Sequence, residues 1–149
     1  MNHRDKAIEL FKRGYNCSQA VFGAFCEELG MDFDTAMRIS SSFGGGIGRM
    51  REVCGAVSGM CMAIGLSHGY SDPTDSKSKS EHYKRIQTLA GEFKEKNGSI
   101  ICRELLGLNS LEISCVPETR TEAFYAKRPC AELIGFAAEL TENYLMSAE

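Results

Sequence analysis

Seven cysteines are the residues of this chain with the greatest capacity for chemistry. They stand at positions 17, 26, 54, 61, 102, 115 and 130, and no two of them form a CxxC pair. This spacing excludes a thioredoxin-type dithiol and the paired cysteines of a zinc ribbon. Any site made from these thiols must therefore be assembled from segments that are distant in the sequence.

Three of the cysteines fall in the first turn of an expected helix. Cys17, Cys102 and Cys130 each follow closely on a residue type that commonly opens helices, namely asparagine, serine and proline. Free N–H groups and the positive end of the helix dipole favour the thiolate, which is the form that attacks disulfides and binds metals. Lys127 and Arg128, which stand just before Pro129 and Cys130, add to this effect.

Cys54 lies in a glycine-rich stretch, FGGGIGRMREVCGAVSG, that spans residues 43–59. The stretch lacks the GK[ST] ending of a nucleoside-triphosphate loop and does not follow a strand as a GxGxxG motif would. We therefore interpret it as a tight turn that clears space around a sulfur, with Arg49 and Arg51 close by. In metal-free protein, Cys54 is expected to be the first thiol to titrate.

The other three cysteines are less distinctive. Cys26 and Cys61 are expected to fill the core as small apolar residues. Cys115 lies in an irregular stretch, where it is either a mobile thiol or a residue without a role. The three histidines share no ligand spacing with one another or with the cysteines, and we expect them at the surface.

Helical periodicity dominates the segments that must position these thiols. Helices are expected around residues 7–13, 16–29, 34–43, 49–66, 76–96 and 129–145, with a further short helix over 99–107. Asn16 and Gln19 form a capping-box pattern, and Asp34 is expected to cap the third helix. In the 76–96 helix, the residues expected to face inward are Tyr83, Ile86, Leu89, Ala90 and Phe93.

The 49–66 segment is expected to be a central buried helix. Gly55, Gly59 and Ala63 recur every four residues on one of its faces, where they would let a second backbone approach closely. That face would serve either a contact within the chain or a helical homodimer. Residues 108–128 show no sustained period and are expected to form an irregular connection.

Length and composition favour one all-α domain over residues 1–149, a helical bundle of about six helices with a glycine-rich turn between two of them. The net charge of −3 and the lack of a basic block argue against nucleic-acid binding. No apolar run is long enough for a membrane span, and the N-terminus does not read as a signal peptide. These features predict a cytoplasmic protein.

Four segments together resemble the C-GCAxxG-C-C family of redox-active proteins: GYNCSQAV, FGGGIGRMREVCGAVSG, ICRELLG and the region of the last cysteine. The resemblance extends over about residues 5–140. It implies that Cys17, Cys54, Cys102 and Cys130 are the functional cysteines, with Cys115 as the alternative to Cys130 for the fourth place. Gly55, Ala56 and Gly59 would complete the central motif and adjoin any bound cofactor.

Three functions remain open at this point. The first is thiol/disulfide electron transfer with a redox partner, either as an oxidoreductase or as a carrier. The second is an electron carrier or sensor in which the same four cysteines bind an iron–sulfur cluster, or zinc, because four thiolates suit both. The third is a helical interaction module without enzymatic activity, in which the cysteines only pack.

Overall fold

A computed structural model describes residues 1–108 and 114–147 of the chain. Within these ranges the fold is all-α, as predicted, and six of its helices have seven or more residues. Its elements are α1 (His3–Lys12), α2 (Cys17–Gly23), α3 (Phe33–Ser40), a 3-10 turn (Ser41–Phe43), α4 (Gly55–His68), α5 (Ser76–Asn97), α6 (Cys102–Leu105), α7 (Glu122–Lys127) and α8 (Cys130–Ser147).

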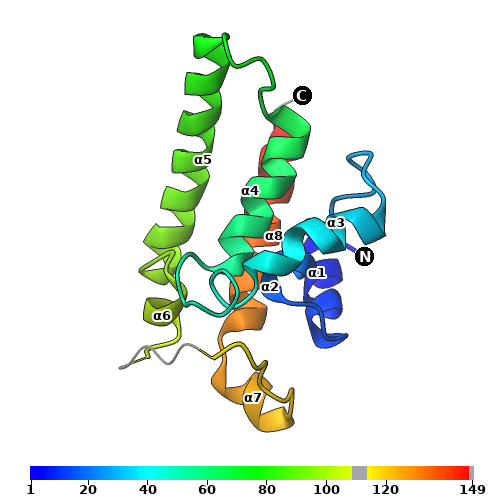
Figure 1. The fold of residues 1–149 in the computed structure, drawn as a ribbon, viewed down its shortest axis with the longest axis vertical. Coiled ribbons are helices and arrows are strands. Elements are labelled where there is room, and N and C mark those ends of the chain that lie inside the picture. The colour runs from blue at the N-terminus through cyan, green and yellow to red at the C-terminus, as the bar shows by residue number, and fades with distance from the viewer. Residues whose placement is uncertain (109–113, 148–149) are drawn as a thin grey trace.

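Two helix pairs make the most extensive contacts in the core: α2 packs on α4, and α1 packs on α8. Helix α5 runs beside α4 and in the opposite direction, while α6 and α7 both lie toward the end of the molecule opposite the α4–α5 connection (Figure 1). Large fully buried side chains from α4, α5 and α8 fill the space between them, among them Met60, Phe93 and Ile134. Tyr83, expected to face inward from α5, is instead half exposed.

Helix α2 begins as predicted and ends earlier than expected. Asn16 accepts a hydrogen bond from the Gln19 amide, and the Gln19 side chain accepts one from the Asn16 amide, which completes the capping box. The helix stops at Gly23 and does not reach residue 29. The apolar pattern continues because Phe25 and Cys26 are buried, but the backbone there follows successive turns.

Several other boundaries differ from the predictions. Helix α3 is capped by Asp32, two residues before the expected Asp34, because the Asp32 carboxylate accepts from the Thr35 amide. Residues 108–128, expected to be irregular, contain α7, which is capped by Thr121. Pro129 directly precedes α8 and is not its first residue.

The predicted 49–66 helix is wrong over its first six residues, and α4 begins only at Gly55. Ile47, Arg49 and Arg51 have left-handed φ angles of 62–64°, and the neighbouring Gly45, Gly46 and Gly48 have left-handed φ angles of 52–71°. Such angles are incompatible with a right-handed helix and are costly for residues with a Cβ. This stretch of chain, which we call the left-handed loop (residues 44–54), is therefore held by its surroundings.

The small-residue face of α4 lies against α2 within the same chain. A Cβ placed on Gly59 would stand 2.7 Å from the Ser18 carbonyl oxygen and 3.0 Å from the Val21 Cβ. The two backbones can approach this closely only because Gly59 lacks a side chain. Among the helices of the described residues, none is both long and apolar enough to cross a membrane.

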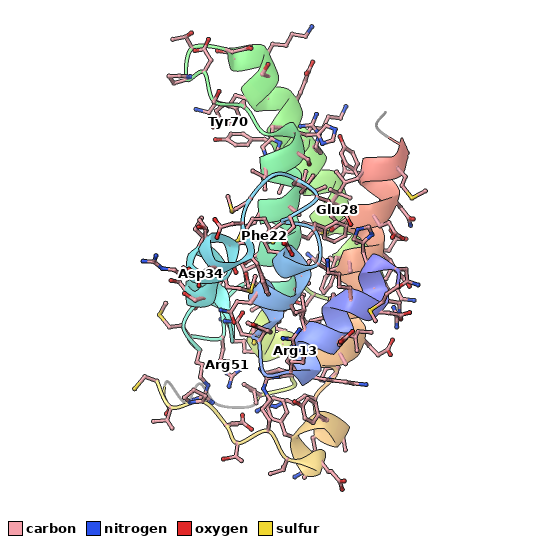
Figure 2. All side chains as sticks on the ribbon, turned by 90° about the vertical axis from the view of Figure 1, so that its right-hand side faces the viewer. Arg13, Phe22, Glu28, Asp34, Arg51 and Tyr70 are labelled. Carbon is pink, nitrogen blue, oxygen red and sulfur yellow. The ribbon has the colours of Figure 1, made fainter. Side chains whose placement is uncertain are left out.

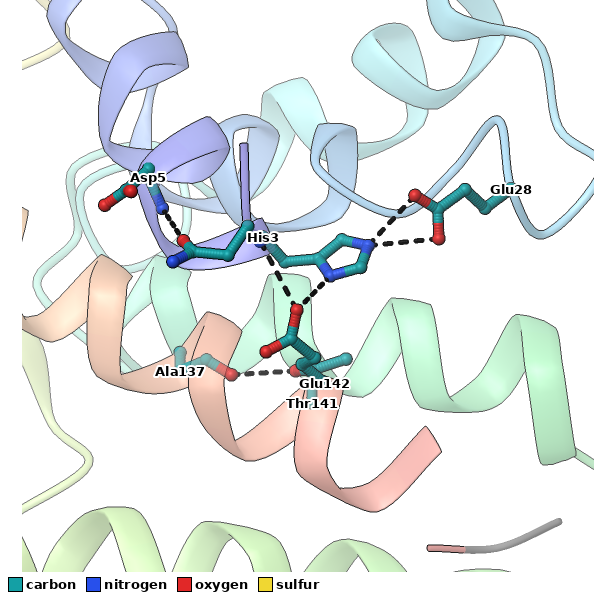
Figure 3. Close-up of polar contacts among 7 residues, drawn as sticks. His3, Asp5, Glu28, Ala137, Thr141 and Glu142 are labelled. Carbon is teal, nitrogen blue, oxygen red and sulfur yellow. Dashed lines mark hydrogen bonds and ion pairs between the residues drawn. The ribbon is translucent and has the colours of Figure 1, made fainter. Parts of the chain in front are cut away.

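The N-terminus is fastened to the core by His3, which is not the plain surface residue expected (Figure 3). Its Nδ1 lies 2.5 Å from a carboxylate oxygen of Glu142 on α8, and its Nε2 lies 3.0 Å from Glu28. Its ring stacks on Phe25 at 4.2 Å. The hydrogen bond from His3 lowers the pKa of Glu142, so this contact strengthens the α1–α8 pair when the carboxylate is ionised.

One buried hydroxyl has no hydrogen-bond partner among the described residues, that of Ser18 on α2. Ser18→Ala is expected to raise the free energy of unfolding by about 1 kcal/mol, because it removes a desolvated polar group and keeps the packing. Ser40→Ala is the matched control, since that hydroxyl is equally buried but donates to the Ala36 carbonyl at 2.7 Å. Urea unfolding that finds no gain for Ser18→Ala over Ser40→Ala would contradict this account.

Candidate functional site

Four cysteines stand at the starts of four different helices. Cys17, Cys102 and Cys130 are the first residues of α2, α6 and α8, and Cys54 directly precedes α4. These are the four positions singled out from the sequence. The 49–66 prediction had left the place of Cys54 unsettled, and the late start of α4 puts it at the end of the left-handed loop.

All four cysteines line one small cavity of about 40 Å³, which we call the cysteine cavity. Its remaining walls are mostly apolar. They come from Gly45, Arg51, Gly55, Ala56, Leu105, Leu106, Leu133 and Ile134. Of the motif residues expected beside a cofactor, Gly55 and Ala56 therefore border the cavity, whereas Gly59 serves the packing of α4 on α2.

Two glycines allow the sulfurs to converge. A Cβ on Gly55 would stand 2.7 Å from the Cys17 Sγ, and a Cβ on Gly46 would stand 2.7 Å from the Cys102 Cβ. Backbone hydrogen bonds then tie the loop to the start of α6: the Cys54 amide donates to Ile100 at 2.7 Å, and the Cys102 amide donates to Glu52 at 2.6 Å. The central glycine-rich motif thus supplies the space for the thiols.

The four thiols differ in their access to solvent. Cys54 and Cys102 are buried, with 6% and 8% of their surface exposed, and line only the cysteine cavity. Cys17 and Cys130 are partly exposed and also line a larger cavity beside it. We call Cys54 and Cys102 the inner pair, and Cys17 and Cys130 the outer pair.

Burial opposes the effect expected from the helix starts. It raises the pKa of Cys130 to about 12, with a further contribution from Cys17, and it also raises the pKa values of Cys54 and Cys102. The expectation that the start of a helix favours the thiolate is therefore wrong for Cys102 and Cys130. The expectation that Cys54 titrates first also fails, since it is buried beside two other thiols.

Arginines partly offset this burial. The Arg51 guanidinium donates a hydrogen bond to the Cys102 Sγ at 3.7 Å and lowers the pKa of that thiol. Arg128 acts in the same direction on Cys102 and Cys130. Sequence reasoning had placed Arg51 near Cys54, but its side chain reaches Cys102, at the same end of the molecule as α7 (Figure 2).

The larger cavity measures about 420 Å³, and we call it the arginine cavity. Four arginines line it together with a single carboxylate, that of Glu118. Glu118 and Arg120 lie in the stretch expected to be an irregular connection, and sequence reasoning gave neither a role. Their only sequence signal was a charged residue on each side of Thr119, in a segment with one proline and two threonines.

The other cysteines stand apart from the cysteine cavity. Cys26 is fully buried in the core, as expected, and its thiol is directed toward the Gly23 carbonyl at 3.8 Å. Cys61 is partly buried against the core, and burial raises its pKa to about 11. Cys115 is exposed and borders only the arginine cavity, whereas Cys130 borders both cavities.

In the part of the chain that the structure describes, no three side chains of the histidine, cysteine, aspartate or glutamate type are arranged so that they could hold a metal ion. The four thiols share a cavity, but in this arrangement they do not fit a metal.

Comparison with known families identifies the pattern of the four cysteines and the central glycines. Residues 15–144 match the family described as "Putative redox-active protein (C_GCAxxG_C_C)". The chain belongs to this C_GCAxxG_C_C family. The resemblance expected from the sequence is thereby confirmed, and a C_GCAxxG_C_C match of this extent includes all four helix-start cysteines. Comparisons with curated proteins and with solved structures gave no match.

Proposed function

We propose that this protein carries out thiol/disulfide electron transfer with Cys17, Cys54, Cys102 and Cys130. The observation that carries the proposal is that four thiols, from the starts of four helices, line one cavity of about 40 Å³. Cysteines that merely fill a core need not gather in this way, and Cys26 and Cys61 do not. Membership of a redox-active family supports the same chemistry.

Electrons enter or leave through the outer pair, because Cys17 and Cys130 are the two of the four cysteines that border both cavities. Oxidation joins two of the thiols in a disulfide and releases two protons and two electrons. The electrons reduce a disulfide of the redox partner, and its two sulfurs take up the two protons. The inner pair can then exchange with the outer disulfide inside the cavity.

A cytoplasmic location suits this activity, because thiols there are kept reduced and a disulfide forms only during turnover. The nearby arginines support the thiolate form needed for attack, against the opposing effect of burial. The proposed role is that of a small oxidoreductase or electron carrier.

The test is to equilibrate the protein, purified without oxygen, across a series of thiol/disulfide redox buffers. The free thiols are then alkylated and the intact mass is measured. We expect a reversible transition that protects two or four of the four named cysteines. It should be lost in Cys17→Ser and Cys130→Ser and kept in the control variants Cys26→Ser and Cys61→Ser. Thiols that stay unbridged under every condition would overturn the proposal.

The cluster or zinc alternative is separated by a measurement on the same sample. Four thiolates are a ligand set for zinc and for iron–sulfur clusters. A visible absorption spectrum, together with the iron, zinc and sulfide content per chain, shows whether either is bound. Stoichiometric metal that is lost in Cys54→Ser would replace disulfide exchange as the function. Metal-free protein with a reversible disulfide would support the proposal.

A further inference from the structure

The arginine cavity adjoins the cysteine cavity. The residues Cys17, Gly45, Arg51, Leu106 and Cys130 border both spaces, so a molecule in the larger one lies beside the outer pair. Its volume of about 420 Å³ is within the range of sites for small molecules, roughly 300–1,000 Å³. The proposed redox site thus has a neighbouring space of ligand size.

The charges around this space are strongly unbalanced. Its charged lining residues have a net charge of +3: the positive ones are Arg49, Arg51, Arg120 and Arg128, and the negative one is Glu118. The whole chain has a net charge of −3. A concentrated positive cavity in an acidic protein attracts anions specifically to that place.

One carboxylate oxygen holds three of the four arginines. The Glu118 Oε1 lies 3.7 Å from a guanidinium nitrogen of Arg49 and 3.8 Å from one of Arg51, and it also accepts a hydrogen bond from Arg128. The arginines are the more buried partners: the side chains of Arg51 and Arg128 are 10% and 17% exposed, against 41% for Glu118. The Glu118 oxygen therefore occupies a position where three guanidinium groups can bind an anionic oxygen.

The fourth arginine, Arg120, fastens the segment that carries Glu118 to the residues around the end of α1. Arg120 donates to the Phe11 and Tyr15 carbonyls at 2.6 and 2.9 Å and stacks over the Phe11 ring at 4.3 Å. Arg49 similarly donates to the carbonyls of Ser114 and Val116. The segment that carries Glu118 is thus fastened at both ends, while its carboxylate remains the exposed member of the cluster.

We propose that the arginine cavity binds the substrate of the cysteine site, and that this substrate is a small disulfide carrying carboxylate or phosphate groups. The inference rests on the proposed function for the disulfide, and on the arginine cluster for the negative charge. An anionic group of the substrate replaces the Glu118 carboxylate among Arg49, Arg51 and Arg128. Its disulfide then lies beside the outer pair.

The reaction follows from this placement. The Cys17 thiolate attacks one substrate sulfur, the substrate S–S bond breaks, and the first substrate thiolate leaves with the electron pair. The Cys130 thiolate then attacks the Cys17 Sγ of the mixed disulfide and releases the second substrate thiolate. The protein loses two electrons, the substrate gains them, and the two protons of the protein thiols pass to the products.

Two model disulfides of opposite character test the charge selection. The dianionic 5,5′-dithiobis(2-nitrobenzoate) and the neutral 4,4′-dithiodipyridine are reacted with reduced protein in a Cys115→Ser background, and the rate at Cys17 is followed by peptide mass spectrometry. The readout is the ratio of the rate with the dianionic reagent to the rate with the neutral reagent, which cancels any effect common to both. Arg49→Gln and Arg128→Gln should lower the ratio about tenfold.

The matched controls are Lys127→Gln and Glu122→Gln, which change exposed charges of the same segment outside the cavity. Both should leave the ratio within about twofold of the parent, while Glu118→Gln should raise it because it frees three guanidinium groups. Added salt should lower the ratio of the parent protein itself. A ratio that is insensitive to the arginines, to Glu118 and to salt would overturn the proposal.

Calorimetric titration of the Cys17→Ser protein with citrate and with inorganic phosphate separates the two parts of the inference. Binding that strengthens in Glu118→Gln supports the anion site, and the tighter of the two probes identifies its anionic group. If such binding occurs while the thiols never form a disulfide, the proposed function fails and the anion site stands. If the disulfide forms but neither probe binds, the substrate assignment fails and the proposed function stands.

Discussion

Gly55→Ala is expected to lower the free energy of unfolding by about 2–3 kcal/mol, a large effect for one methyl group. The added Cβ would stand 2.7 Å from the Cys17 Sγ, 2.8 Å from the Phe43 carbonyl oxygen and 3.1 Å from the Ser18 amide. Two of these neighbours are backbone atoms that cannot rotate away. The start of α4 must therefore move off α2, which enlarges the cysteine cavity and separates Cys54 from Cys17.

Gly65→Ala is the matched control for this substitution. Gly65 lies in the same helix, and a Cβ there meets nothing within 4 Å. Because alanine is the better helix former, this variant should be stabilised by about 0.5–1 kcal/mol. Urea unfolding followed by far-UV circular dichroism measures both. Equal effects of the two substitutions would show that close approach at Gly55 is not what holds the site together.

The second large effect concerns alkaline pH. The folded protein keeps the Cys130 proton up to a pKa of about 12, whereas an ordinary cysteine, as in the unfolded chain, loses it near 9.0. Between these values the unfolded state binds fewer protons than the folded state, so stability falls as pH rises. The loss approaches about 1.4 kcal/mol per pH unit for one such thiol. It is complete only above pH 12.

Unfolding of the fully reduced protein from pH 8 to 11, in about half-unit steps, tests this slope. Lysines and tyrosines also titrate in this range, so the quantity compared is the difference between variants. Cys130→Ser should flatten the slope by up to one proton, while Cys115→Ser, which removes an exposed thiol, should leave it unchanged. Parallel slopes for the two variants would mean that Cys130 is not held protonated by burial.

Local signals in the sequence predicted much of the helical framework. The capping box at Asn16 and Gln19 marks the start of α2, and Gly98 ends α5 with a φ of 90°. Both are effects of a few neighbouring residues, which a single sequence contains in full. Because Cys17, Cys102 and Cys130 stand near such starts, their helix positions could be predicted with the helices, whereas the position of Cys54 could not.

Features that depend on distant contacts could not be predicted. Nothing local to Ile47, Arg49 or Arg51 indicates a left-handed backbone, since residues with a Cβ seldom adopt it. Glu118 gains its meaning only when the fold brings three arginines around it. The ionisation of the thiols was misjudged for the same reason, because the extent of burial is a property of the assembled cavity.

The separation of the four cysteines along the chain gives the oxidation state a mechanical meaning. The nearest two of the four, at 102 and 130, are 28 residues apart, and the outer pair, 17 and 130, are 113 apart. A disulfide between any two would close a long covalent loop and reduce the conformational entropy of the unfolded chain. For loops of these sizes the free energy of unfolding would rise by about 3–5 kcal/mol at 25 °C. Each change of redox state would therefore also change the free energy of unfolding. The oxidised protein would resist unfolding and proteolysis better than the reduced protein.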